Sequence, residues 1–467
     1  MNTRSRYNAA MNLAIQRFGT IHDLVSGISW SADQLAAEVE RRAAGLSVVN
    51  PGSIVAITHG GTAAFFADLF AVWSRGGAAA CLDPALTQSE RDNVIAFCNA
   101  SVVLSAEGAA KRDGAGRAPD GTALILFTSG TTGAPKGVVL SSQALFARIE
   151  LNRRAIGDDT LARTLVTLPT HFGHGLIGNA LTPLVARGDI VLAPRGLGLA
   201  QQLGSHIDKH GVTFMSSVPS LWQMALRMSP RPSKQTLQRV HIGSAPLSAA
   251  TWQRIQDWCG CPVVNCYGIT ETSNWIAGAS TAEHPPSDGF VGKPWGGRAG
   301  VVTADGKIAA SGEGEIAIQS PALMTGYLSR PDLTTAVLKD GWYRTGDLGE
   351  VNERGEIRLT GRAKDEINRA GFKIQPAEID MLLERHPSVA EACTFGAPDA
   401  ISGEIVAVAV RLAPGAKETA QTLRKWCQTY LRREATPERW FFVDEIPKTS
   451  RGKVSRDSVR KALLEKS

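Results

Sequence analysis

One run of small, hydroxylated and basic residues stands out in the sequence, between positions 128 and 137. It reads Thr-Ser-Gly-Thr-Thr-Gly-Ala-Pro-Lys-Gly and directly follows the apolar segment 123–127. Its glycines allow several backbone N–H groups to turn toward one point, its hydroxyls add donors, and its lysine adds a positive charge. The spacing is not that of a Walker loop, in which Ser or Thr follows the lysine directly. The run predicts a phosphate-binding loop whose binding residues are Thr128, Ser129, Gly130, Thr131, Thr132, Gly133 and Lys136.

Four further motifs follow in order along the chain. They are Asn-Cys-Tyr-Gly-Ile-Thr-Glu at 265–271, Tyr-Arg-Thr-Gly-Asp at 343–347, Gly-Arg-Ala-Lys-Asp at 361–365 and Pro-Lys-Thr-Ser-Arg-Gly-Lys at 447–453. A carboxylate suits a divalent cation, a second carboxylate suits a vicinal diol, and a lysine that follows a glycine supplies a mobile ammonium group. With the phosphate loop, these motifs resemble the adenylate-forming superfamily of acyl-CoA synthetases, peptide-synthetase adenylation domains and luciferases over nearly the whole chain.

The resemblance implies that the chain joins a carboxylic acid to ATP, giving an acyl adenylate and pyrophosphate. Glu271 is the implied Mg²⁺ ligand, and Thr270 is the implied donor to the α-phosphate. Lys136 and Lys453 are implied to stabilise the negative charge that builds up in this step. ATP, Mg²⁺ and CoA are therefore the expected cosubstrates and cofactor.

The resemblance also implies how the nucleoside is bound. The backbone of residues 243–246 is expected beside one face of adenine and Tyr267 beside the other, while Asp347 and Arg362 are the implied partners of the ribose hydroxyls. Beyond the phosphate loop, the implied ATP-binding residues are Gly243, Ser244, Ala245, Pro246, Asn265, Tyr267, Gly268, Thr270, Asp347, Arg362 and Lys453.

In a second step, a thiol must attack the adenylate. Enzymes of the superfamily rotate a small domain between the two steps, so that the residues for the thiol step take the place of those for the ATP step. The resemblance places the pivot at Lys364 and puts Gly371 beside the thiol tunnel. The expected domains are a large one at 1–362, a hinge at 363–365 and a small mobile one at 366–467. CoA is the expected thiol, and the pantetheine of an acyl carrier protein is the alternative.

The acid pocket is expected near residues 169–175, Pro-Thr-His-Phe-Gly-His-Gly. The superfamily has a His or aromatic gate three residues after the proline, which is Phe172 here; whether Phe172, His171 or His174 serves stays open. No Asp or Glu lies between 169 and 179, so a buried α-ammonium would be unpaired and free α-amino acids are disfavoured. An aryl or other apolar acid is expected, since Phe172 or Trp275 would stack on a ring. The full expected lining is His171, Phe172, His174, Val218, Gly243, Gly268 and Trp275.

The motifs lie among segments that alternate between strand and helix patterns. Residues 31–47 place apolar side chains at helical spacing after a serine, 53–57 read as a buried strand, and 61–77 as a helix. This alternation predicts an α/β fold with doubly wound parallel sheets. From about 301, short strands with turns at Asp305–Gly306 and Arg354–Gly355 take over, where a distorted β-barrel-like region is expected. The C-terminal part is expected to be a small α+β unit.

Composition limits the remaining possibilities. The chain has 467 residues, 43% of them hydrophobic and 20% charged, and a net charge of +6, which is typical of a globular protein with more than one unit. The mild charge, and the absence of basic stretches interleaved with aromatics, argue against nucleic-acid binding. A non-catalytic nucleotide-binding regulator is disfavoured because every expected catalytic position is filled.

The cysteines and the apolar segments bear on location. The seven cysteines are odd in number, which disfavours a disulfide framework. Three of them fall within 259–266, but no second Cys or His pair follows at zinc spacing. No apolar run is long enough for a signal or membrane segment. We expect a cytoplasmic protein without membrane partners, either monomeric or homodimeric.

Overall fold

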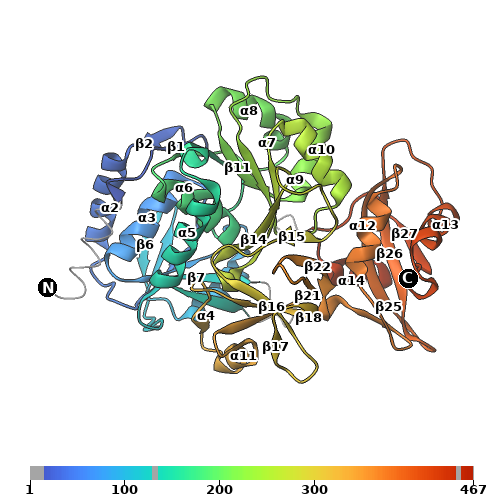
Figure 1. Ribbon diagram of the computed structural model, residues 1–467. Coiled ribbons are helices and arrows are strands. Elements are labelled where there is room, and N and C mark those ends of the chain that lie inside the picture. The colour runs from blue at the N-terminus through green and yellow to red at the C-terminus, as the bar shows by residue number, and fades with distance from the viewer. Residues whose placement is uncertain (1–14, 129–134, 449–453, 466–467) are drawn as a thin grey trace.

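The strands of the protein form four sheets, shown in the computed structural model of Figure 1. The structure describes residues 15–128, 135–448 and 454–465. None of the helices in these ranges is long and apolar enough to cross a membrane. The longer helices are α2 (Ala32–Gly45), α3 (Ala63–Ser74), α4 (Gln88–Cys98), α5 (Ser142–Ile156), α8 (Leu203–His210), α9 (Pro219–Met228), α10 (Ala249–Cys259), α12 (Pro376–Glu384), α13 (Ala420–Tyr430) and α14 (Arg456–Leu464). The shorter ones are α6 (Thr182–Val185), α7 (Leu197–Gln201) and α11 (Pro331–Val337).

The first sheet has the order β14-β13-β12-β11-β9-β10-β1-β2. Its strands from β13 to β1 pair in parallel, and antiparallel strands flank them at both edges. The carboxyl ends of β12 and β13 therefore share one edge, where such sheets bind ligands. The bounds are β1 Ile21–Asp23, β2 Ile28–Trp30, β9 Arg163–Val166, β10 Asp189–Leu192, β11 Phe214–Ser217, β12 Arg239–Ile242, β13 Val263–Ile269 and β14 Asn274–Ser280.

The second sheet has the order β19-β8-β7-β4-β3-β5-β6. Its central strands β7, β4, β3 and β5 are parallel, and β8, β19 and β6 pair antiparallel outside them. The predicted doubly wound α/β organisation is thus confirmed for both sheets. The bounds are β3 Ile54–Ile57, β4 Ala78–Cys81, β5 Val102–Ser105, β6 Gly108–Lys111, β7 Thr122–Thr128, β8 Lys136–Ser141 and β19 Gly326–Tyr327.

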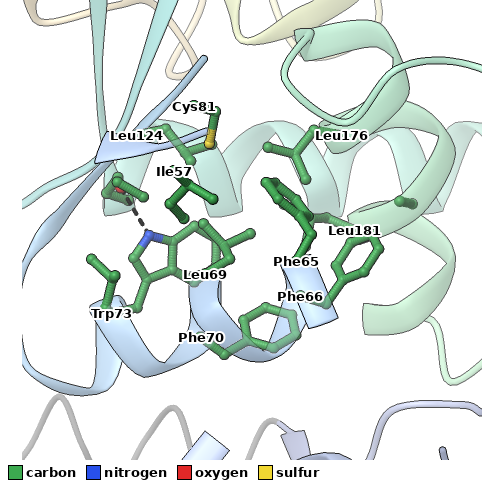
Figure 2. Packing of buried hydrophobic residues seen from close by; sticks show 14 of the residues in the cluster. Ile57, Phe65, Phe66, Leu69, Phe70, Trp73, Cys81, Leu124, Leu176 and Leu181 are labelled. Carbon is green, nitrogen blue, oxygen red and sulfur yellow. Dashed lines mark hydrogen bonds between the residues drawn. The ribbon is translucent and has the colours of Figure 1, made fainter. Parts of the chain in front are cut away.

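Helix α3 lies in the largest hydrophobic core and confirms the helix predicted over 61–77. Its sequence is mainly apolar, as expected for a helix with no solvent face, and its one charged residue, Asp68, is paired with Arg42 and His59. Figure 2 shows its aromatic side chains against residues of the second sheet and of the helical turn at 174–181. Trp73 Nε1 donates to the Ala123 carbonyl at 2.8 Å, which satisfies its buried N–H group. Helix α2 begins at the predicted Ser31 cap, where Ser31 and Gln34 form a capping box.

The third sheet is antiparallel and has the order β15-β22-β21-β18-β16-β17, with β20 beside β21. Strands β15 and β17 are its two edges and do not pair with each other, so the described strands form an open sheet where a distorted barrel was expected. Both predicted hairpin turns are present, with Gly306 and Gly355 at φ of 80° and 75°. The bounds are β15 Phe290–Gly292, β16 Arg298–Val302, β17 Ile308–Ala309, β18 Gly312–Gln319, β20 Leu338–Lys339, β21 Trp342–Val351 and β22 Ile357–Arg362.

The C-terminal residues form a fourth sheet with its own hydrophobic clusters, drawn in orange and red in Figure 1. Helix α12 packs on β25 and also contacts β22 of the third sheet. An ion pair between Arg385 and Asp288 joins this small α+β unit to the rest of the chain. The bounds are β23 Ile367–Arg369, β24 Phe372–Ile374, β25 Val389–Asp399, β26 Gly403–Leu412 and β27 Arg439–Phe442.

A cluster of charged side chains lies between α12, β25 and the C-terminal helix of this unit. Arg456 Nη1 lies 2.6 Å from Asp380 Oδ2, and Lys448 Nζ lies 2.8 Å from Glu391 Oε1. Glu384 has a weaker contact, accepting from the Ala392 N–H at 3.4 Å. Burial, with a contribution from the charge of Asp380, raises the pKa of Glu384 to about 8.

We predict that replacing Glu384 by Gln removes part of the pH dependence of stability. An acid whose pKa is raised on folding binds more protons in the folded state, so its contribution to stability falls as the pH rises toward 8. At pH 8.5, E384Q should therefore be more stable than wild type, while at pH 5 the difference should nearly vanish. Guanidinium unfolding at both pH values measures this. E378Q, on the exposed face of the same helix, is the control; an equal response from it would contradict the prediction.

Candidate active site

The two ends of the predicted phosphate loop are held by neighbouring strands. Thr128 ends β7 and Lys136 begins β8, and the two residues are partners in the antiparallel register. This register brings the loop ends together at the carboxyl end of β7. The intervening loop residues Ser129, Gly130, Thr131, Thr132 and Gly133 lie outside the described residues.

Lys136 and Glu271, from different sheets, form an ion pair at this edge. Lys136 Nζ lies 3.8 Å from Glu271 Oε1 and 3.8 Å from the ring centroid of Tyr327. Tyr327 Oη donates to the same Glu271 oxygen at 2.8 Å, and Tyr343 Oη lies 3.4 Å from Tyr327 Oη. Burial lowers the pKa of Lys136 and raises that of Tyr327. The ammonium and the carboxylate are thus held in place by a cation–π contact and a phenol hydrogen bond.

A second carboxylate is buried where β21 and β22 pair. Asp347 and Arg362 are register partners, and Arg362 Nε lies 2.7 Å from Asp347 Oδ1. Tyr267 Oη donates to Asp347 Oδ2 at 2.7 Å. The charge of Asp347 raises the pKa of Arg362, while burial is the main cause of the raised pKa of Tyr267. Three residues expected around the nucleoside therefore form one hydrogen-bonded group.

After β12 and β13, the chain passes so close to neighbouring backbone that two positions have no room for a side chain. A Cβ on Gly243 would lie 2.9 Å from the Cys266 carbonyl oxygen, and one on Gly268 would lie 2.3 Å from that of Asn274. Ser244 has a left-handed φ of 69° and is followed by Ala245 and Pro246. Asn265 Nδ2 donates to the Phe290 carbonyl at 2.9 Å, which ties β13 to β15. Thr270 and Glu271 lie in the short helical turn that follows β13.

His174 occupies the centre of the predicted acid pocket. Its Nε2 lies 2.6 Å from Ser216 Oγ, its Nδ1 lies 2.8 Å from Ser244 Oγ, and its ring centroid is 5.2 Å from that of Trp275. Ser216 Oγ donates its proton to the His241 carbonyl at 3.3 Å, so it accepts from Nε2–H. In the neutral ring, Nδ1 then accepts from Ser244. His174 thus connects the wall at 243–246 with the interior of the pocket.

The other expected pocket residues make separate contacts. His171 Nε2 lies 3.4 Å from Asp83 Oδ2, which directs this ring toward the end of β4. The ring centroid of Phe172 is 6.2 Å from that of His174. Val218 is buried directly before α9. Of the three candidates for the gate, it is His174 that contacts both Ser244 and Trp275.

The predicted hinge and thiol-tunnel residues lie on the surface. Lys364 is exposed in the turn Ala363–Asp365. Gly371 is exposed in the β23–β24 hairpin, and no described residue lies within 4 Å of the position that its Cβ would take. The structure therefore does not bring Gly371 together with the other predicted site residues. Lys453 lies outside the described residues; Lys448, on one side of it, and Arg456, on the other, are the anchored members of the charged cluster described above.

Arg148 is a site-supporting residue that the sequence analysis missed. It is fully buried, and it donates from Nε to the Thr272 carbonyl at 3.2 Å, from Nη1 to the Trp295 carbonyl at 3.4 Å and from Nη2 to Ser320 Oγ at 3.3 Å. Thr272 ends the turn that carries Glu271. In the sequence, Arg148 could have been noticed because it lies on the otherwise mainly apolar, buried face of the helix at 142–156. Tyr327 and Ser216 were missed as well, and neither belongs to a recognisable motif.

We predict that R148M destabilises the protein by roughly 2–4 kcal/mol, because it leaves buried oxygen acceptors without a donor. The matched control is R153M on the same helix. Arg153 forms only partly exposed ion pairs with Asp158 and Glu150, and its loss should cost about 1 kcal/mol or less. Guanidinium unfolding of both variants checks this; equal destabilisation would contradict the role given to Arg148.

Comparison with known proteins agrees with the arrangement of the site residues. The family model described as AMP-binding enzyme matches residues 14–116 and 105–328, and the one described as AMP-binding enzyme C-terminal domain matches 378–453. An oxalate–CoA ligase of Arabidopsis thaliana is 33% identical over 354 residues, covering 74% of this chain and 69% of the relative. A fatty acid–acyl-carrier-protein ligase, ScoC of Streptomyces coeruleorubidus, is 34% identical over 357 residues, covering 73% and 67%.

Solved structures extend the similarity to the whole fold. ATP-bound MatB from Rhodopseudomonas palustris has a TM-score of 0.84 and 26% sequence identity, with 97% of this chain and 98% of that one covered. The match therefore extends over nearly the full length of both chains. On the motifs, the site geometry and these matches, the chain belongs to the family of AMP-binding, adenylate-forming enzymes.

Proposed function

We propose that this chain is an ATP-dependent carboxylic acid–CoA ligase. It forms an acyl adenylate with release of pyrophosphate and then passes the acyl group to the thiol of CoA. The observation that carries this proposal is the Lys136–Glu271 ion pair, held by Tyr327 where the phosphate-loop motif meets β8. Two anionic reactants must meet in the first step, so fixed positive charge and a metal-binding carboxylate are needed there. Membership of the family and similarity to an oxalate–CoA ligase support the assignment.

Glu271 is the proposed protein ligand for Mg²⁺. The described residues contain no group of three or more His, Cys, Asp or Glu that could hold a metal ion by itself. Mg²⁺ at nucleotide sites commonly takes one or two carboxylates and otherwise phosphate oxygens and water, which fits a single carboxylate beside a phosphate loop. The ion would neutralise charge on the phosphates. Tyr327 and Lys136 both contact Oε1, so they fix the orientation of this carboxylate.

The remaining ATP contacts follow from the buried Asp347 group. A carboxylate is a natural acceptor for the vicinal ribose hydroxyls, and Arg362 and Tyr267 hold Asp347 in a fixed orientation. The adenine is proposed to lie between the backbone of 243–246 and the ring of Tyr267. The phosphates then extend toward the loop at 128–136.

In the first step, a carboxylate oxygen of the acid attacks the α-phosphorus of ATP. The bond between the α-phosphorus and the oxygen bridging to the β-phosphate breaks, and pyrophosphate leaves. Thr270 is proposed to donate to the α-phosphate, and Lys136 and Lys453 to stabilise the charge that develops.

In the second step, the CoA sulfur attacks the adenylate carbonyl, the thiol proton is lost, and AMP leaves. We propose that the small domain, 366–467, rotates about the hinge at 363–365 between the steps. Gly371 is exposed in the present arrangement, and the rotation would bring its hairpin beside the thiol. The unpaired, buried state of all seven cysteines supports a reducing compartment, and the cytoplasm is the proposed location.

A carrier-protein thiol is the second candidate acceptor. It is favoured by the similarity to ScoC, which is named as an acyl-carrier-protein ligase. Thioester formation with CoA and with a holo carrier protein, measured side by side, separates the two. Faster transfer to the carrier protein would replace CoA in the proposal and leave the adenylation step unchanged.

We predict that K453A slows acid-dependent pyrophosphate release by about 10²–10³-fold, because its charge acts in adenylate formation. Thioester formation from presynthesised adenylate should change much less. Lys461, exposed in the last turn of α14, provides the control, and K461A should retain both rates. An equal loss in the two half-reactions would contradict the role proposed for Lys453.

We predict the opposite pattern for K364P. Proline fixes φ near −65° and prevents the backbone rotation that the hinge must absorb. Pyrophosphate release should stay near the wild-type rate while thioester formation is blocked. K364A removes the same side chain but keeps the backbone free, so it should support both steps. Normal thioester formation by K364P would rule out alternation about this residue.

A further inference from the structure

The identity of the acid has to come from the pocket of this chain. Relatives of nearly equal identity are named for oxalate and for a fatty acid, so overall similarity does not choose between small polar acids and long apolar ones. The interior of the pocket, beneath Gly243 and Ser244, is formed by the ends of β12 and β14 and the helical turn at 174–181.

Three buried nitrogen atoms in this interior lack a hydrogen-bond partner among the described residues: His241 Nδ1, Asn274 Nδ2 and Trp275 Nε1. Their residues are only 2%, 5% and 2% exposed. Buried polar groups without partners are rare and costly in folded proteins. Three of them in one place indicate a site for a ligand.

The three residues lie against one another and against His174. The Trp275 ring centroid is 4.8 Å from that of His241 and 5.2 Å from that of His174. A Cβ on Gly178 would lie 2.1 Å from Asn274 Nδ2 and 2.8 Å from Trp275 Cη2. The side chains of Asn274 and Trp275 therefore both pack directly against Gly178, where there is no room for a side chain.

The backbone also shows that Asn274 is held in an unusual conformation. Its φ is 115° and that of the preceding Ser273 is 57°, in a region that non-glycine residues seldom adopt. The strand register between β13 and β14 is irregular at the neighbouring position. Such conformations persist where the surrounding structure enforces them, and they gather at binding sites. Here the conformation belongs to a residue whose buried side-chain nitrogen, Nδ2, has no hydrogen-bond partner among the described residues.

The cluster requires an oxygen acceptor from its ligand. The indole Nε1–H and the amide Nδ2–H groups can only donate. Burial lowers the pKa of His241 well below its ordinary value, so this ring is neutral and adds no positive charge. The Trp275 ring already makes edge-to-face contacts with the rings of His241 and His174.

We propose, on the basis of the acid–CoA ligase function, that the substrate is a short acid with an oxygen acceptor at its distal end. That oxygen, from a keto group or a second carboxylate, accepts hydrogen bonds from Trp275 Nε1 and Asn274 Nδ2, while the reacting carboxylate points toward Ser244 and the nucleotide. This proposal departs from the apolar acid expected from the sequence. Trp275 acts here as a donor, and its ring packs on protein neighbours.

The test compares acids of similar size that differ in one distal group. Acetoacetate and malonate carry the oxygen, butanoate lacks it, and benzoate is the apolar ring. In wild type, kcat/KM for pyrophosphate release should favour an oxygen-bearing acid over butanoate by about 10²-fold or more, since butanoate would leave the donors unpaired. Acetoacetate against malonate distinguishes a neutral acceptor from an anionic one.

Variants test whether the donors cause the preference. W275F keeps a ring but removes Nε1–H, and it should lower kcat/KM for the oxygen-bearing acids about 10-fold more than kcat/KM for butanoate. The matched control is W258F: Trp258 is also buried, but its Nε1 donates to the Ser229 carbonyl outside the pocket. W258F should keep the wild-type preference.

Several results would overturn the proposal. Better turnover of butanoate or benzoate than of either oxygen-bearing acid would remove the acceptor subsite, although the ligase function would stand. Equal loss on all acids in W275F would mean that Trp275 only supports the structure. Absence of pyrophosphate release with every acid would instead contradict the proposed ligase function itself.

Discussion

The hydrogen bond from Tyr327 to Glu271 connects the parts of the molecule on which the site depends. Tyr327 belongs to the second sheet, Glu271 follows β13 of the first, and Tyr343, which lies beside Tyr327, belongs to the third. Without these partners, a carboxylate close to the phosphates would repel them or rotate toward water. The phenol and the ammonium of Lys136 hold it in one orientation, and these contacts link residues from all three sheets.

The sequence predicted what is encoded locally. Ser31 and Gln34 start α2 through a capping box, and the mainly apolar segment 63–74, interrupted by Asp68, forms a buried helix. The motif residues were found because each motif is a short run of residues, close together in the sequence, that resembles the corresponding run of the superfamily. Thr128 and Lys136, which belong to the first of these motifs, are partners in the register of β7 and β8.

What the sequence could not predict depends on segments far apart in the chain. Arg148 reaches the Glu271 turn from a helix more than a hundred residues earlier, and Ser216 reaches His174 from another strand. The sequence left open whether Phe172, His171 or His174 gates the pocket, because the hydrogen bonds of His174 to Ser216 and Ser244 depend on segments that are distant in the chain. Whether the third sheet closes was also undetermined, because strand patterns specify pairing faces but not the partner at each edge.

The contacts of Arg456 bear on which residues would absorb the proposed rotation of the small domain. Its guanidinium lies 2.6 Å from Asp380 and 3.8 Å from Asp365, and Asp365 is the last residue of the hinge turn. Both partners stand on the C-terminal side of Lys364, so a swing about that residue leaves these contacts unbroken. Arg456 therefore ties Asp365 to the small C-terminal unit. In the proposed rotation, Asp365 would move with that unit, and Ala363 and Lys364 would absorb the change in backbone angles.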